Sequence, residues 1–95
     1  MATKTVKFTP AGIAKLPNDK PAVYSIQTES GRTNYIGSAQ RGRVRERLQE
    51  HLPGARDPVP GAKVQVQQAH RIDAARRTEA RAIARTQPKY NKQGK

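Results

Sequence analysis

The sequence lacks cysteine and tryptophan, and it contains only one phenylalanine and three tyrosines among 95 residues. Without cysteine, the chain has no disulfide partner, no thiolate zinc site and no cysteine nucleophile. No apolar run approaches the roughly 20 residues with which a helix crosses a bilayer, and residues 1–8 carry no signal-peptide block. We therefore expect a soluble, intracellular protein of the cytoplasm that does not enter a membrane.

Acidic residues are also scarce, with 7 Asp and Glu against 19 Lys and Arg, which gives a net charge of +12. The sequence pI is near 11.0. A domain this basic attracts polyanions, and nucleic acid is the commonest of them. The charge thus favours a nucleic-acid partner. Taken alone, it also fits a basic scaffold protein or a disordered basic segment.

The length favours a single domain with a small core, because only 34% of the residues are apolar. We expect residues 1–16 to be a polar leader followed by a short helix that starts at Thr9-Pro10, with Thr as N-cap. Residues 17–91 form the predicted folded domain, and residues 92–95 a polar tail.

Three segments of the predicted domain have the pattern of strands and two have the pattern of helices. Residues 22–27 and 34–37 flank a Gly-containing turn, which predicts a hairpin, and residues 63–67 alternate strictly between polar and apolar. Residues 43–52 place apolar side chains four apart, and residues 71–86 have no internal Gly or Pro. The order predicts an α+β fold, in which a three-stranded mixed or antiparallel sheet is flanked by helices.

The last predicted helix carries one acidic residue on its apolar face. Glu79 shares that face with Ile72 and Ile83. A carboxylate there costs free energy unless it is paired or binds a cation, and the ordinary alternative is an ion pair with Arg76. The opposite, outer face of the helix carries a row of arginines, Arg77, Arg81 and Arg85.

The middle helix is predicted to hold Arg47 and His51 one turn apart beside its apolar stripe. The planar fork of an arginine suits a phosphate group, although most surface arginines are simply solvated. His51 is suited to orienting a water molecule, although a lone helical histidine is more often incidental.

Five elements of the sequence together resemble the GIY-YIG nucleases over residues 17–91. They are Ala22-Val23-Tyr24, Tyr35-Ile36-Gly37-Ser38, Val44-x-x-Arg47-Leu48-x-x-His51, Glu79 in a helix, and Pro88-Lys89-Tyr90-Asn91. Ala and Val replace the Gly and Ile of the first named triplet. The order and spacing of the five elements make the resemblance specific.

The resemblance implies a metal-dependent endonuclease that hydrolyses phosphodiester bonds, most simply of DNA, with a structure or single-strand preference left open. It implies that Glu79 binds Mg²⁺, or Mn²⁺ in its place, and that Arg47 neutralises charge on the phosphate. Either Tyr24 or Tyr35 would take a proton from the attacking water, with His51 beside them. Supporting roles fall to Gly37, Ser38 and Asn91.

The remaining basic residues are the predicted nucleic-acid-binding surface, since arginines that contact phosphates give affinity without sequence preference. The candidates are Arg41, Arg43, Arg45, Arg77, Arg81 and Arg85. The alternative to an enzyme is a non-catalytic nucleic-acid-binding module on the same fold. The residues leave the oligomeric state open.

Overall fold

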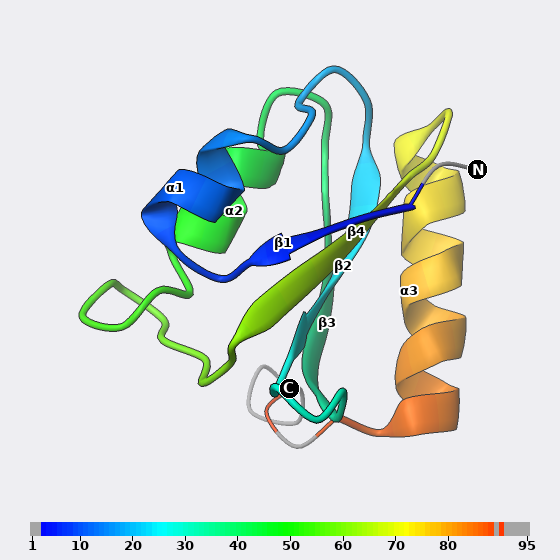
Figure 1. Cartoon of the computed structure of the whole chain (residues 1–95). Helices are drawn as coiled ribbons and strands as arrows, with labels where there is room; N and C mark the ends of the chain where they lie inside the picture. The colour runs from blue at the N-terminus through cyan, green and yellow to red at the C-terminus, as the bar shows by residue number, and fades with distance from the viewer. Residues whose placement is uncertain (1–2, 89, 91–95) are drawn as a thin grey trace.

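The computed structural model describes residues 3–88 and residue 90, which form one layer of strands between two layers of helices (Figure 1). The elements in chain order are β1 (Thr3–Lys7), α1 (Pro10–Ala14), β2 (Ala22–Gln27), β3 (Thr33–Ala39), α2 (Val44–Gln49), β4 (Lys63–Gln68) and α3 (Ile72–Thr86). The α+β class is therefore confirmed. None of the described helices is long and apolar enough to cross a bilayer.

The sheet has four antiparallel strands in the order β1-β4-β2-β3. The prediction of three strands is wrong, because the segment expected to be a polar leader is β1. Its side chains are exposed except for the half-buried Val6, so they show no buried alternating face of the kind that signals a strand. Backbone pairing with β4, in which Val6 lies opposite Val64, incorporates the segment into the sheet.

The two faces of the sheet are covered by different helices. One face carries α1 and α2, and the other carries α3 (Figure 1). The larger core cluster includes Ile13, Leu16 and Leu48, all fully buried on the α1 and α2 side. On the α3 side the buried cluster is smaller and consists of Val23, Ile36, Ala69 and Ala75.

The helix ends agree with the prediction to within two residues except at the end of α2. Thr9 caps α1 by accepting a hydrogen bond from the backbone N–H of Gly12, as its sequence predicts. By contrast, α2 ends at Gln49, so His51 lies in the turn that follows and not within a helix. The loop after α2 folds back, and its backbone N–H groups donate hydrogen bonds to the carbonyls of Glu50 and His51. These carbonyls at the end of the helix therefore have donors without a further helical turn.

Candidate active site

Strand β3 forms one edge of the sheet, and both α2 and α3 pack against it. Side chains on one face of β3 point toward α2, and those on the other face point toward α3. Residues held by the two helices can therefore meet around this edge strand without crossing the sheet. Most of the site residues predicted from the sequence lie in this region.

Tyr24, Tyr35 and His51 form an aromatic cluster on the α2 face of β2 and β3. The rings of the two tyrosines stack with their centroids 6.2 Å apart. The centroid of the His51 ring lies 4.7 Å from that of Tyr35 and 5.9 Å from that of Tyr24. Tyr24 is only 3% exposed and His51 only 4%, so both side chains are fixed by their surroundings.

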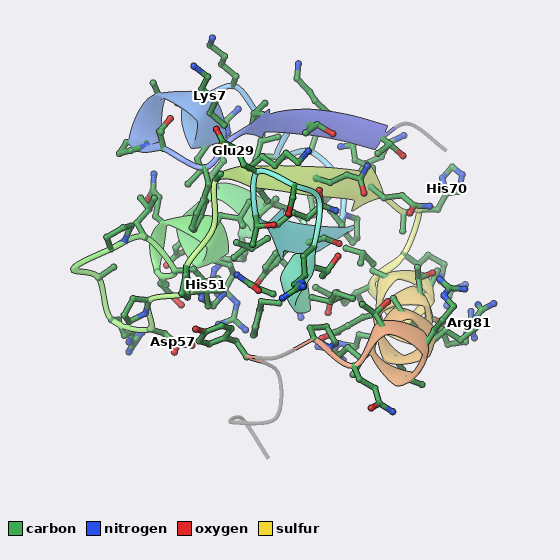
Figure 2. The ribbon with its side chains drawn as sticks, turned by 60° about the horizontal axis from the view of Figure 1, so that its bottom comes forward. Lys7, Glu29, His51, Asp57, His70 and Arg81 are labelled. Atoms are coloured by element: carbon green, nitrogen blue, oxygen red, sulfur yellow. The ribbon has the colours of Figure 1, made fainter. Side chains whose placement is uncertain are left out.

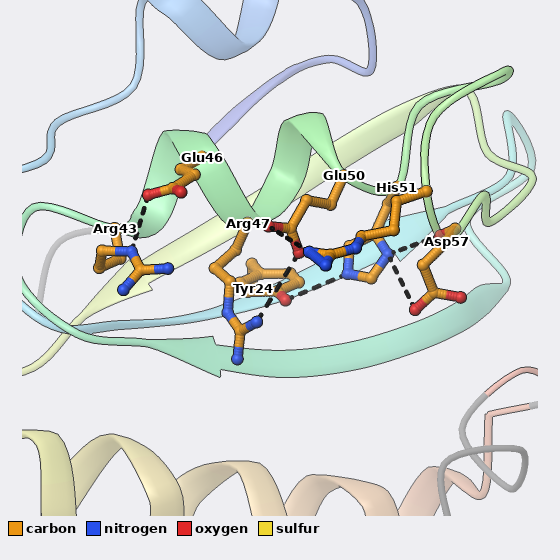
Figure 3. A network of polar contacts seen from close by, with 8 residues as sticks. Tyr24, Arg43, Glu46, Arg47, Glu50, His51 and Asp57 are labelled. Atoms are coloured by element: carbon orange, nitrogen blue, oxygen red, sulfur yellow. Dashed lines mark hydrogen bonds and ion pairs between the residues drawn. The ribbon is translucent and has the colours of Figure 1, made fainter.

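Both nitrogens of His51 have partners, which indicates the tautomer of the neutral ring (Figure 3). Nδ1 lies 2.9 Å from the backbone carbonyl oxygen of Asp57. A carbonyl only accepts, so Nδ1 carries the proton. Nε2 is then an acceptor, and the hydroxyl of Tyr24, at 3.3 Å, donates to it. His51 is thus held in place by hydrogen bonds within the cluster and is not an incidental surface residue.

Burial raises the pKa of both tyrosines above the ordinary value for a phenol, because the anion is poorly solvated there. The negative charge of Glu79 raises both pKa values further, and the positive charge of Arg47 opposes this. The two phenols are therefore protonated at neutral pH. They also respond to Glu79 and Arg47, which come from helices on opposite faces of the sheet.

Gly37 lies opposite Tyr24 across β2 and β3, and the phenol lies directly against its backbone. A Cβ atom on Gly37 would be 2.7 Å from both Cζ and the hydroxyl oxygen of Tyr24, which is far inside ordinary contact. The position of the Tyr24 ring therefore requires a glycine at position 37.

Glu79 reaches the same point of β3 from the other face. The hydroxyl of Ser38 donates to Oε1 of Glu79 at 2.6 Å. The predicted inward face is confirmed, since Ala75 on that face is fully buried and Ile72 and Ile83 pack beside it. The expected alternative, an ion pair with Arg76, does not form.

The carboxylate of Glu79 fits one kind of metal ion better than others. Among the described residues, no group of three or more His, Cys, Asp or Glu could enclose an ion, which rules out a closed structural zinc site within that range. Oε2 of Glu79 has no described hydrogen-bond partner. One available carboxylate, with water and phosphate as the other ligands, is a usual arrangement for Mg²⁺.

The positive charge of Arg47 acts on the aromatic cluster, where it opposes the rise in the pKa of Tyr24 and Tyr35. Its side chain is 50% exposed, and its nearest acidic partner is Glu50, at 3.7 Å. Glu50 also lies 3.8 Å from a guanidinium nitrogen of Arg56. Such exposed pairs are weak, so the guanidinium remains available to another anion.

The other residues predicted to bind nucleic acid or to support the site differ in their contacts and exposure. Arg45 donates from Nε to the carbonyl of Leu16 at 2.7 Å, which ties α2 to the end of α1. The arginine row on α3 is exposed, and Figure 2 shows Arg81 on the outer side of α3, away from His51. Asn91 lies outside the described residues. Arg76, which the sequence did not assign to the binding surface, borders the same hollow as Arg47.

Known proteins resemble this chain in structure. No protein-family model and no curated protein matches the sequence. The chain is similar to the GIY-YIG N-terminal endonuclease domain of UvrC from Thermotoga maritima, bound to its catalytic magnesium, with 26% identity over 82% of this chain and 93% of that chain and a TM-score of 0.62. A tyrosine-to-phenylalanine variant of that domain, also holding its divalent cation, matches with 25% identity, the same coverages and a TM-score of 0.62.

This likeness agrees with the motifs read from the sequence. It covers most of both chains, and it supports a nuclease-type function. The two tyrosine-bearing strands, the arginine-bearing helix and the helix with the inward glutamate occur here in the predicted order. The chain belongs to the GIY-YIG superfamily.

Proposed function

We propose that the protein is a metal-dependent endonuclease that hydrolyses phosphodiester bonds of DNA. The observation that carries the proposal is that Tyr24 and Glu79 contact two consecutive residues of β3, Gly37 and Ser38. The phenol of Tyr24 lies against one of these consecutive residues, and the carboxylate of Glu79 is hydrogen-bonded to the next. An acid–base group and a hard-oxygen metal ligand therefore flank one point of an accessible sheet edge.

Phosphodiester hydrolysis requires an activated water, neutralisation of charge on the phosphate and a fixed geometry. Glu79 is the residue proposed to hold the divalent cation, Mg²⁺ or Mn²⁺, with Ser38 fixing its orientation. When bound, such a cation stabilises the charge on phosphate oxygens and lowers the pKa of a coordinated water. Arg47 supplies the second positive charge through its fork of N–H donors.

The hydrogen bond between Tyr24 and His51 favours Tyr24 as the base. Burial raises the pKa of Tyr24, so a free phenolate would be unfavourable at neutral pH. Tyr24 instead accepts a proton from the attacking water while its own proton passes to Nε2 of His51. The phenol stays neutral throughout, and the carbonyl of Asp57 stabilises the resulting imidazolium through Nδ1. Tyr35 is left to position the substrate.

The test separates cutting from binding in the same protein. Glu79→Gln, Arg47→Ala and Tyr24→Phe should each reduce cleavage by about 100-fold or more, while Glu79→Gln and Tyr24→Phe leave oligonucleotide affinity within a few fold. Glu29→Gln is the matched control, because Glu29 is an exposed acid in the hairpin turn and should cut normally.

The substrates are duplex DNA, single-stranded DNA, flap, junction and RNA, each tested with Mg²⁺, Mn²⁺ and EDTA. Cleavage that survives Glu79→Gln, or that persists in EDTA, contradicts the assigned site. Binding without cleavage of any substrate under either metal would identify a non-catalytic nucleic-acid-binding module. Cleavage of RNA alone would contradict the choice of DNA.

A further inference from the structure

A second feature lies next to the candidate active site and is not explained by it. A pocket of about 190 Å³ opens where the end of β3 meets α2 and α3. Its lining residues are Ser38, Ala39, Gln40, Arg43, Arg47, Ile72 and Arg76. Neither phenol, nor His51, nor Glu79 lines it. The pocket therefore shares only Ser38 and Arg47 with the site proposed for hydrolysis.

Three arginines from both sides of the sheet line this pocket. Arg43 and Arg47 come from the start and middle of α2, and Arg76 comes from α3. No acidic residue is among its described lining residues. Like charges around one hollow repel each other, so the arrangement is stabilised when an anion occupies it.

The three arginines differ in the ion pairs and hydrogen bonds that they already form. Arg43 is paired through Nε with Glu46 at 2.7 Å, and Arg47 has only its long contact with Glu50. Arg76 forms no ion pair or hydrogen bond with any described residue. Arg76, which is exposed on α3, is therefore the most available donor of the three.

We propose that this pocket binds one backbone phosphate next to the phosphate that is cleaved. The proposal rests on the proposed function, because Glu79 and Tyr24 mark where cleavage occurs. The pocket, with a volume of about 190 Å³, has room for a phosphate group. Arg47 borders both places and so bridges two successive phosphates.

The chemistry of the lining distinguishes a phosphate from other ligands. No aromatic side chain is among the described lining residues, so a nucleobase would have no ring to stack on. No carboxylate is among them either, so a second metal ion would lack a hard anionic ligand. A planar fork of N–H donors from each of three arginines matches phosphate oxygens best.

The first measurement is binding by the Glu79→Gln protein, in which cleavage does not interfere. Arg76→Ala in that background should weaken affinity for a short DNA oligonucleotide about 10-fold and should reduce the slope of log affinity against log salt by about one. Arg32→Ala is the matched control, since it removes the same charge from an exposed position in the turn between β2 and β3, outside the pocket and outside the predicted binding surface. Equal losses from both variants would overturn the proposal.

The second measurement identifies the phosphate. Oligonucleotides with one neutral methylphosphonate at each position in turn are bound to the Glu79→Gln protein, with and without the additional Arg76→Ala substitution. At one position, neutralisation should weaken binding about 10-fold only when Arg76 is present, and that position should neighbour the cleaved bond mapped with the wild-type protein. Absence of any such position overturns the proposal even if cleavage is confirmed. If the wild-type protein does not cut, the proposed function fails, while coupling to Arg76 still establishes a phosphate pocket.

Discussion

Gly37→Ala tests how tightly the phenol of Tyr24 is held in the site. The added Cβ would lie 2.7 Å from the Tyr24 ring and hydroxyl, whereas ordinary contacts begin near 3.4 Å. The phenol or the strand must therefore move by about 0.7 Å. Tyr24 is 3% exposed and stacks on Tyr35, so it has little room to retreat. Its hydroxyl bond to His51 is already 3.3 Å long and is easily lost.

Forcing one methyl group into a packed interior typically destabilises a protein by about 1–3 kcal/mol. For a domain of this size, each kcal/mol corresponds to roughly 4–8 °C in Tm. We therefore expect Gly37→Ala to lower the urea midpoint without changing the m value. Cleavage should fall by more than the loss of folded protein explains, since Tyr24 is displaced in molecules that remain folded.

The control is a double-mutant cycle with Tyr24→Ala, which removes the ring that the methyl group meets. Tyr24→Ala alone is destabilising because a buried aromatic side chain is lost. In that background Gly37→Ala should be nearly neutral, which gives a coupling free energy of about 1–3 kcal/mol between the two positions. An equal loss of stability from Gly37→Ala in both backgrounds would refute the assigned contact.

Two further predictions follow from the hydrogen bond to Glu79 and from the buried phenol. Ser38→Ala should reduce both Mg²⁺ affinity and cleavage by about 10- to 100-fold, which a titration of the cleavage rate with metal would measure. The control is Ser25→Ala, on β2 and on the same face of the sheet, which should change neither quantity. An unaffected Ser38→Ala protein would contradict the positioning role. Burial raises the pKa of Tyr24, so the unfolded chain loses this proton first as pH rises past 10.0. The contribution of this proton to the free energy of unfolding is fully present below that pH. Above that pH the contribution should be lost at about 1.4 kcal/mol per pH unit. Urea unfolding at pH 9, 10 and 11 should show a shallower alkaline decline for Tyr24→Phe than for the wild type, and identical slopes would contradict the argument.

The sequence was most informative where a pattern of side chains determines the structure. The hairpin of β2 and β3 and the helix α3 were predicted because alternation and helix propensity act locally. The inward position of Glu79 followed from helix periodicity alone. The hairpin was predicted without its register, which the structure gives as Tyr24 opposite Gly37.

Features that depend on backbone pairing or on distant segments were not predictable. β1 joins the sheet through backbone hydrogen bonds, and its exposed side chains carry no signal of this. The tautomer of His51 is set by the carbonyl of Asp57, and any residue at that position would present the same carbonyl. The pocket beside Arg76 exists only because α2 and α3 flank one strand, so its arginines meet although they are far apart in the sequence.

The division of the core between the two sheet faces has a consequence for how the protein responds to mild denaturation. α3 is held by a small cluster whose described buried residues are Val23, Ile36, Ala69 and Ala75, whereas the phenols belong to the larger cluster on the other face. Burial of less apolar surface gives a smaller free energy for local opening. Detachment of α3 would carry Glu79, the proposed metal ligand, away from an otherwise intact half-site, so the domain should lose the proposed cleavage activity before it loses its architecture.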